Sequence, residues 1–443
     1  MTLAFQSADL ASWGRVSRER QTVARPRFVS DLAMLGGEDA APRLAVGLRR
    51  SYGDSCLFGG GRLVDMSGLD RFIAFDRATG LVRAEAGLSL DALMTMSVPH
   101  GWFAPVTPGT RRVTLAGAVA NDVHGKNHHL AGSFGRHVRA FTLLRSDRGV
   151  VEVTAETDPA LFAATIGGLG LTGIIQDVTL QLTAIRSSEL ETENLPIGNL
   201  ADYFALDAES ATRFEHTVAW VDCTRRGDRL GLGVYSRANW ATDGPLAPHL
   251  PPRITVPAAA PGLPVNRLTL GAFNRLYRYR QLAAPRARRR PYGAVFHPLD
   301  AVGQWNTLYG RSGFYQHQSV VPRASAEDAV REMLRLVAAS GQGSPLFVLK
   351  SFGELASPGL LSFPRPGHTL AMDFPNKGAA TLTLIRRLDA IVREAAGALY
   401  PAKDGLMTRE MLDLGYPRFD ELLALRDEAC GSDFLTRMQG GHP

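Results

Sequence analysis

Short runs of alternating apolar and polar residues, separated by glycine-rich turns, fill the chain from about residue 41 to residue 182. The stretch RLVDMSGLDRFIAFDRATGLVRAEAGLSLDALM predicts three strands and the start of a helix, with turns at residues 67–68 and 79–80. LLRSDRGVVEVT predicts a hairpin that turns at residues 147–149, and GIIQDVTLQLTA predicts a half-buried strand. Many short strands without a regular strand–helix repeat indicate an α+β domain rather than a doubly wound sheet.

Helical periodicity replaces this pattern in the last third of the chain. SAEDAVREMLRLVAASG predicts a helix that is capped at Ser325 and ends at Gly341. TLTLIRRLDAIVREAAG predicts a second helix that ends at Gly397. Between them, LFVLKSFG and HTLAMDFP predict strands. The pattern indicates a second domain, in which helices cover a sheet.

Residues from about 243 to 293 interrupt both patterns. They are rich in proline, arginine and alanine and have poor periodicity, which predicts a mobile excursion rather than a packed element. Residues 274–293 contain seven arginines and no acid. Two interpretations stay open: a solvated loop, or a patch that contacts anionic lipid head groups or a phosphorylated substrate. Nothing resembles a nucleic-acid reading helix, so no nucleic-acid partner is expected.

Length and composition place the chain among ordinary soluble proteins with two domains. It has 443 residues, of which 45% are hydrophobic and 21% charged. Cys56, Cys223 and Cys430 are far apart and form no CxxC pair, which fits a reducing compartment and predicts neither a disulfide frame nor a zinc site. No secretion signal and no apolar run of about 18 residues is visible. We therefore expect a cytoplasmic protein without a transmembrane helix.

Three segments are similarly rich in glycine and also contain polar side chains. They are AVGLRRSYGDSCLFGGG (residues 45–61), PGTRRVTLAGAVANDVHGKNHHLAGSFG (residues 108–135) and TIGGLGLTGII (residues 165–175). Glycine lets backbone N–H groups approach and converge on a pyrophosphate. Three such loops in one domain favour a dinucleotide cradle. The Walker pattern is absent, and IGGLGLTG lacks the acidic residue that a Rossmann fingerprint places about 20 positions further on.

The histidines of the second segment raise the question of a metal. His124 and His128 are four residues apart, and His129 follows. The glutamate of an HExxH zinc motif is missing, and the glycine and asparagine between the histidines disfavour a helix there. We therefore expect no metal.

Together the glycine-rich segments resemble the FAD domain of vanillyl-alcohol-oxidase-type flavoproteins. Within that superfamily the resemblance is to the decaprenylphosphoryl-β-D-ribose oxidase family, the flavin subunits of a 2′-epimerase. It extends to FHPLDAVGQWNTLYG, GFYQHQSVVP, VLKSFG, SFPRPGHTLAMDFP and LYPAKD, and thus covers nearly the whole chain. HGKNHH with AGSFG is its most specific part. The resemblance implies a PCMH-type FAD-binding domain at residues 1–185, completed by residues 400–443. Residues 186–399 would form a substrate domain with an antiparallel sheet covered by helices.

The resemblance also implies a non-covalently bound FAD and a map of its contacts. The residues of this map are Arg50, Ser51, Tyr52, Gly53 and Asp54 at the pyrophosphate, Gly109, Thr110, Thr114 and Gly117 at the ring and ribityl chain, Asp122, His124 and Asn127 nearby, and Gly170, Ile175 and Tyr400. Ile175 would contact the adenine half and Tyr400 the flavin ring.

Oxidation of an alcohol needs a hydride acceptor, a proton acceptor and contacts that aim the C–H bond. By resemblance, Lys403 in PAKD and His124 are the catalytic candidates, although the sequence around Lys403 alone would suggest a surface turn. The candidates for substrate binding are Gln316, Gln318, Lys350, Phe352, Trp220, Lys126 and Asp373. Gln316 and Gln318 alternate along a strand and so share a face, as do Lys350 and Phe352.

The implied reaction is oxidation of the 2′-hydroxyl of a polyprenyl-phosphoryl-β-D-ribose to the 2′-keto sugar. An NADH-dependent short-chain reductase would be the partner, and the lipid substrate implies peripheral contact with the inner membrane. Ala371, Phe296 and Thr369 stand where the family has cysteine, tyrosine and asparagine, which leaves the lipid and sugar specificity open. Two alternatives stay open: a soluble FAD-dependent sugar or alditol oxidase, and a flavin-binding subunit without turnover.

Overall fold

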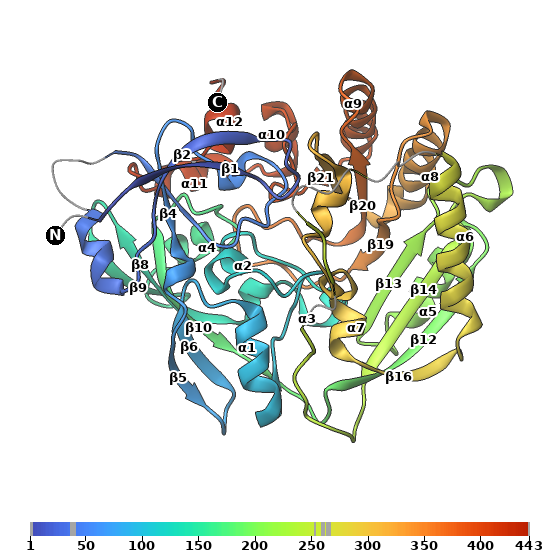
Figure 1. Cartoon of the computed structure of the whole chain (residues 1–443), viewed down its shortest axis with the longest axis horizontal. Helices are drawn as coiled ribbons and strands as arrows, with labels where there is room; N and C mark the ends of the chain where they lie inside the picture. Colours follow the sequence, from blue (N-terminus) through green and yellow to red (C-terminus); the bar gives the residue numbers. More distant parts are fainter. Residues whose placement is uncertain (1–2, 36–40, 252–253, 258–261, 263–266, 442–443) are drawn as a thin grey trace.

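Two large clusters of buried apolar side chains organise the chain. The computed structural model describes residues 3–35, 41–251, 254–257, 262 and 267–441. One cluster draws mainly on residues 32–185, and the other mainly on residues 195–438. Figure 1 shows the two corresponding lobes side by side, the first in blue to green and the second in green to orange. The expected two-domain α+β fold is confirmed.

The first lobe contains two main sheets. The smaller joins β1 (Gln6–Ala11), β2 (Arg18–Ala24), β4 (Arg62–Asp65) and β3 (Arg43–Val46), in that order, with β4 parallel to both neighbours. The larger is antiparallel and joins β5 (Phe72–Asp76), β6 (Leu81–Glu85), β10 (Ile174–Gln181), β8 (Val138–Arg145) and β9 (Gly149–Thr154). Helices α1 (Leu90–Ser97), α2 (Leu115–Ala120), α3 (His128–Ala131) and α4 (Pro159–Thr165) and the pair β7 (Trp102–Phe103) and β11 (Thr183–Ala184) complete it. The hairpin expected at residues 147–149 is confirmed as β8–β9.

The second lobe is built on one antiparallel sheet of eight strands. Their order is β16 (Ala287–Pro291), β12 (Glu189–Ile197), β14 (Gly233–Trp240), β13 (His216–Val221), β19 (Phe347–Phe352), β20 (Gly367–Pro375), β18 (Phe314–Val321) and β21 (Ala398–Leu399). Helices α5 (Leu200–Ser210), α8 (Arg323–Ser340) and α9 (Ala379–Glu394) carry buried apolar rows that pack against the sheet.

The alternation of side chains along β18 separates the two faces of this sheet. His317 points to α9, where its Nε2 atom lies 3.1 Å from Oδ1 of Asp389. Gln316 and Gln318, on either side of it, face a cavity. Because side chains alternate along a strand, one face packs on helices and the other is free to line a site. The shared face expected for the two glutamines is confirmed.

Both predicted helices have slightly different ends. Helix α8 begins at Arg323, two residues before the expected cap, because the extended Pro322 occupies the position before the first turn. The Oγ atom of Ser325 lies inside that turn and donates to the Pro322 carbonyl at 3.3 Å. Helix α9 ends at Glu394, three residues before Gly397, because Ala396 adopts the left-handed conformation with φ 54°.

The expectation of an irregular, mobile stretch from about residue 243 to residue 293 is wrong for most of its described part. Arg267–Ala283 form helix α6, Ala287–Pro291 form β16 and Tyr292–Phe296 form α7. Ile254–Thr255 form β15, which pairs with β17 (Val302–Gly303). Residues 252–253, 258–261 and 263–266 of this stretch lie outside the described residues.

Ionic pairing explains why the arginine-rich part is a strand. Strand β16 pairs with β12 along the edge of the sheet, and Arg289 lies directly opposite Glu191. The guanidinium of Arg289 is 3.4 Å from the Glu191 carboxylate and 2.5 Å from that of Asp243. Opposite charges across a strand pair stabilise the pairing, so β16 forms an edge strand although its few apolar residues would not predict one.

The C-terminal segment connects the two lobes. It contains α10 (Arg409–Gly415), α11 (Phe419–Leu425) and α12 (Asp433–Met438), and its apolar side chains join the core of the second lobe. Arg437 of α12 makes a bidentate ion pair with Asp54 of the first lobe, at 2.7 and 2.9 Å. Nothing larger than glycine fits at Gly53, because a Cβ atom there would lie 1.6 Å from the Asp404 carbonyl oxygen. None of the helices in the described residues is both long enough and apolar enough to cross a bilayer.

The ion pair between Arg437 and Asp54 makes a testable contribution to stability. In Arg437→Met the buried Asp54 carboxylate loses its partner, so we expect the melting temperature of the flavin-loaded protein to fall by about 3–8 °C. Arg409→Met removes exposed ion pairs with Asp413 and Asp420 and is the matched control, with a change near zero. Thermal release of flavin fluorescence measures both. Equal melting temperatures for the two variants would contradict this role of Arg437.

Candidate active site

A cavity of about 660 Å³ lies between the glycine-rich loops of the first lobe and the open face of the eight-stranded sheet. Residues 45–56, 107–126 and 169–175 line one side, and strands β13, β18, β19 and β20, residues 294–305 and residues 400–403 line the other. The volume is typical of a site for a cofactor or a large ligand. The three glycine-rich segments, far apart in sequence, therefore meet at one site.

The first loop presents polar groups to this cavity. Arg50, Ser51 and Tyr52 line it, as the sequence predicts. The nearby Ser55 has a buried Oγ atom without a hydrogen-bond partner. Within the described chain, none of the backbone N–H groups of residues 47–51 donates to a protein acceptor. Backbone and hydroxyl donors of this kind are suited to a pyrophosphate, so the loop fits the phosphate part of FAD.

The second loop approaches the first closely and turns into α2. The Thr114 hydroxyl accepts a hydrogen bond from the Gly117 N–H at 3.1 Å and caps this helix. A Cβ atom on Gly47 would lie 2.3 Å from the same hydroxyl, so the loops are in contact. A Cβ atom on Gly109 would meet nothing within 4 Å, which leaves the backbone open to a flat ligand. Thr110 lines the cavity with these residues.

The remaining wall of the expected flavin site is also in place. Gly170, with φ +78°, and Ile175 line the cavity next to the first loop. Tyr400 lines it from the second lobe, stacks on Phe363 with ring centroids 4.5 Å apart and donates its hydroxyl proton to the Asn121 carbonyl at 2.9 Å. The tyrosine ring is therefore held rigidly at the cavity wall.

Four residues expected to contact FAD lie behind the cavity wall instead: Gly53, Asp54, Asp122 and Asn127. Asp122 accepts hydrogen bonds from the Ser362 hydroxyl at 2.5 Å and the Gly135 N–H at 2.8 Å, and burial raises its pKa. The Asn127 amide donates to the Pro105 carbonyl at 2.9 Å. These two side chains shape the histidine-containing loop, while Gly53 and Asp54 hold the C-terminal segment.

His124 forms the centre of a buried cluster with Lys350 and Gln318. Its Nδ1 atom is 2.8 Å from the Lys350 amine, and its Nε2 atom is 3.1 Å from the Gln318 amide nitrogen. Burial and the charge of Lys350 hold the pKa of His124 well below its usual range. Burial and the nearby Lys126 and Lys403 do the same for Lys350. The imidazole is therefore neutral, with one nitrogen accepting and the other donating.

Lys403 projects from the turn after β21 into the cavity. Its amine lies 3.9 Å from the centre of the Tyr52 ring, in a cation–π arrangement. Burial lowers the pKa of Lys403 to about 8, although the negative charge of Asp373 raises it. An amine with a pKa near neutrality can both hold and accept a proton at the site.

Asp373 and Phe352 stand behind the residues that face the cavity. The Asp373 carboxylate accepts a hydrogen bond from the Gln316 amide at 2.6 Å, and burial raises its pKa to about 7. The Phe352 ring packs edge-on against His124, with centroids 4.9 Å apart. Both residues thus position side chains that line the site, and neither lines it directly.

Lys126 and Trp220 occupy the part of the cavity nearest α6 and α7. The Lys126 amine donates to the carbonyls of Val295 and Phe296 at 3.0 and 3.1 Å. Burial, with the charge of Arg290, lowers the pKa of Lys126 to about 8. The indole N–H of Trp220 donates to the Pro345 carbonyl at 2.7 Å, which fixes its ring in the wall.

The three histidines of the glycine-rich segment do not converge. The Nδ1 atom of His128 accepts the Gly353 N–H at 3.2 Å, and the Nε2 atom of His129 is 2.9 Å from the Phe214 carbonyl. No group of three or more histidine, cysteine or acidic side chains in the described residues is placed to hold a metal ion.

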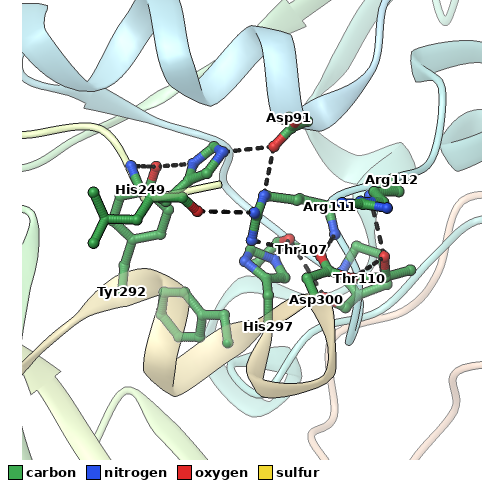
Figure 2. A network of polar contacts seen from close by, with 12 residues as sticks. Asp91, Thr107, Thr110, Arg111, Arg112, His249, Tyr292, His297 and Asp300 are labelled. Carbon is green, nitrogen blue, oxygen red and sulfur yellow. Dashed lines mark hydrogen bonds and ion pairs between the residues drawn. The ribbon is translucent and has the colours of Figure 1, made fainter. Parts of the chain in front are cut away.

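A polar network ties the second glycine-rich loop to the second lobe (Figure 2). The Asp300 carboxylate accepts the Thr110 hydroxyl at 2.7 Å and the Arg111 N–H at 2.9 Å. The Arg111 guanidinium contacts Asp91 at 2.5 Å, and His249 contacts the same carboxylate at 2.5 Å. Burial raises the pKa of Asp91, but the hydrogen bonds from His249 and Arg111 outweigh it and lower the value to about 2.

The sequence did not single out this network. The Thr107 hydroxyl lies 2.7 Å from Nε2 of the buried His297, and Tyr292 lies 2.5 Å from Nδ1 of His249. The partners are about 190 positions apart in the first case, so no local spacing reveals them. The one available signal was the FHPLD segment, which contains both His297 and Asp300. These side chains act as positioning residues for the loop that lines the cavity.

We expect Asp300→Asn to weaken FAD binding by about tenfold or more. The amide can accept from only one of the two donors that the carboxylate satisfies, so the other is left buried and unpaired. Titration of the apoprotein with FAD, followed by quenching of flavin fluorescence, gives the dissociation constant. Asp228→Asn, at an exposed site in the second lobe, is the matched control. An unchanged dissociation constant in Asp300→Asn would contradict the positioning role.

Comparison with known proteins agrees with this geometry. Residues 29–154 match the FAD binding domain family. The chain is 37% identical to decaprenylphosphoryl-beta-D-ribose oxidase of Mycolicibacterium smegmatis over 97% of each chain. It is 25% identical to D-lactate dehydrogenase of Anaerostipes hadrus over 45% of this chain and 44% of that one. A plant L-galactono-1,4-lactone dehydrogenase, from Arabidopsis thaliana, is 25% identical over 40% of this chain and 26% of its own.

The family match and the fit of the cavity establish the cofactor and the class of chemistry. The cofactor is FAD, and the protein is an FAD-dependent oxidoreductase. The identity to the mycobacterial oxidase extends over both lobes, so it covers the substrate sheet as well as the flavin loops. The chain belongs to the family of FAD-dependent oxidases that includes decaprenylphosphoryl-β-D-ribose oxidase.

Proposed function

We propose that this protein oxidises the 2′-hydroxyl of a polyprenyl-phosphoryl-β-D-ribose to the 2′-keto sugar. The observation that carries the proposal is the shared cavity, in which the flavin loops face Lys403, His124, Gln316 and Gln318. Neutral amides are suited to sugar hydroxyls, and a desolvated amine is suited to their proton. The name of the mycobacterial relative supports the same class of substrate.

In this proposal Lys403 takes the proton of the 2′-hydroxyl as the C–H bond is broken. Bound FAD supplies the hydride acceptor. The pKa of about 8 leaves part of the Lys403 population neutral near pH 7, which a proton acceptor requires. After accepting the proton, the ammonium is stabilised by the Tyr52 ring and the nearby Asp373.

The two amides orient the sugar, and the His124 imidazole holds one of them in place. Gln318 is held by His124 at 3.1 Å and by the Thr369 hydroxyl at 3.3 Å. Gln316 is held by Asp373 at 2.6 Å. Because each amide is fixed from behind, its remaining donor or acceptor can hold a sugar hydroxyl at low entropic cost. The Lys350 amine contacts Nδ1 of His124 and donates to the Gly125 carbonyl, so it fixes the imidazole that holds Gln318.

Lys126 and Arg290 are the cations best placed to meet the substrate phosphate. Both line the cavity on the side of α6 and α7. Burial lowers the pKa of both side chains, helped by the charge of Arg290 at Lys126 and by that of Arg288 at Arg290, and a bound phosphate would offset this repulsion. Lys350, a substrate-binding candidate from the sequence, instead contacts His124 and the Gly125 carbonyl.

The flavin would be bound without a covalent link to His124, since both of its ring nitrogens contact Lys350 and Gln318. The 2′-keto product calls for a reductase that returns hydride to the other face of the sugar. An NADH-dependent short-chain reductase has this chemistry, and the sequence of the present chain shows no nicotinamide site of its own. We place the pair in the cytoplasm, with peripheral contact to the membrane that holds the polyprenyl chain.

The rate of flavin reduction should rise with pH and level off above about pH 8, because only the neutral amine of Lys403 accepts a proton. Lys403→Ala should lower the rate about 10²–10⁴-fold and abolish the pH dependence. Lys403→Arg keeps the charge but cannot lose its proton, so it should be as slow as the alanine variant. Anaerobic stopped-flow spectroscopy gives these rates. A fast arginine variant would show that Lys403 acts through its charge alone.

The substrate is tested by anaerobic spectroscopy of the flavin-loaded protein. We expect decaprenyl-phosphoryl-ribose to bleach the flavin absorption, and free ribose or xylitol to leave it unchanged. Bleaching by a free sugar or polyol would assign the protein to the soluble sugar or alditol oxidases. A flavin that none of these compounds reduces would overturn the proposed substrate and favour a subunit without turnover.

A further inference from the structure

Helix α6 exposes an apolar stripe on its outer side. Leu268 is 85% exposed, Leu276 56% and Tyr279 71%, and Ala272 and Ala283 are exposed as well. These positions are spaced by four, four, three and four residues, which places them on one face of a helix. In Figure 1, α6 lies along the outer edge of the second lobe, outside β14 and β12. We call these five residues the outer stripe.

The inward face of the same helix is of mixed polarity, since Leu270 is buried in the core beside two polar side chains. Asn274 is buried and donates to the Asp222 carboxylate at 2.6 Å, and the Gln281 side chain accepts from the Asn194 amide at 3.0 Å. A helix that only covered a globular core would keep its apolar residues on the inward side and have a polar outer side. The outer stripe is therefore not explained by packing within the lobe. Contiguous exposed apolar surface of this kind marks a binding surface.

The charges around the stripe indicate what it binds. Arg275 and Arg280 flank it on its two sides and are exposed, and the described residues of α6 include no acid. On the adjacent strand β16, Arg289 is neutralised by Asp243 and Glu191. An apolar stripe between arginines is the pattern of a helix that lies in the interface of an anionic bilayer.

The stripe is also next to the cavity. Phe273 and Tyr277, one turn apart on the same helix, line the cavity, and Tyr277 packs on Trp220 with ring centroids 4.8 Å apart. The outer stripe lies on one side of α6 and the cavity on the other, so only this helix separates them.

We propose that α6 docks this enzyme on anionic phospholipid, with Leu276 and Tyr279 inserted between the lipids. The helix then positions the cavity at the bilayer surface, where the sugar phosphate enters and its polyprenyl chain stays among the lipids. The orientation rests on the proposed substrate, but docking on anionic lipid is independent of it. This mode needs no transmembrane segment.

Co-sedimentation with vesicles tests the docking surface in the flavin-loaded full chain. Wild-type protein should bind vesicles containing about one third phosphatidylglycerol, bind pure phosphatidylcholine more weakly, and be released by salt. Leu276→Glu with Tyr279→Glu should lower the partition coefficient about tenfold or more. Ile73→Glu with Val150→Glu, at exposed apolar sites of the first lobe, is the matched control and should bind as wild type does.

A second readout keeps the test decisive if the charged variant is unstable. Tryptophan emission of Tyr279→Trp should shift to shorter wavelength on addition of the anionic vesicles. Equal binding of wild type and the α6 variant, or no binding at all, would overturn the proposal. A wild type that is dimeric in sedimentation velocity and becomes monomeric in the variant would assign the stripe to a second copy of the chain instead.

Flavin reduction by detergent-solubilised polyprenyl-phosphoryl-ribose separates this inference from the proposed function. The α6 variant should be reduced at the wild-type rate, since detergent removes the need for a membrane. If that substrate reduces neither protein while the wild type still binds vesicles, the proposed substrate fails and the docking surface stands.

Discussion

The burial of three lysine amines in one cavity is the constraint on which the rest of the site depends. Lys126, Lys350 and Lys403 face the same space, and in the described part of the chain no carboxylate lies within ion-pair distance of any of them. Burial lowers the pKa of all three. Without a bound anion such a site is energetically costly, because each charged amine is desolvated and has no carboxylate to balance its charge. The cavity is therefore suited to ligands that bring negative charge, as a flavin dinucleotide and a sugar phosphate both do, and to chemistry that needs a neutral amine.

This electrostatic arrangement works only if the two lobes are held in register. The flavin loops belong to the first lobe, whereas Gln316 and Gln318 project from a strand of the second. Two of the contacts that fix their relative position are the hydrogen bonds of Asp300 to residues 110–111 and the ion pair of Arg437 with Asp54. Both join residues that are far apart in the sequence. The rate of the reaction therefore depends on these two contacts, because a small displacement of a reacting group lowers the rate by a large factor.

Local patterns in the sequence predicted more of the fold than of the site. Alternation and turn residues located the β8–β9 hairpin and the strand that contains Gln316 and Gln318, because those features are encoded within about ten residues. Lys403 would have been taken for a surface residue, and only the family resemblance pointed to the cavity. The network around Asp300 and His249 had no local signal at all. Helix α6 was missed for a physical reason: it has apolar residues on both its buried and its exposed side, so no single apolar face marks it, and the element was taken for an irregular loop.

In the proposed reaction the hydride leaves C2′ of a ribose that lies between the flavin loops and Lys403. The most direct test is the rate of anaerobic flavin reduction with decaprenyl-phosphoryl-ribose deuterated at C2′, compared with the same substrate deuterated at C3′. We predict that deuterium at C2′ slows reduction several-fold and that deuterium at C3′ leaves the rate unchanged. A normal rate with the C2′-deuterated substrate, or slowing by deuterium at C3′ alone, would contradict the account.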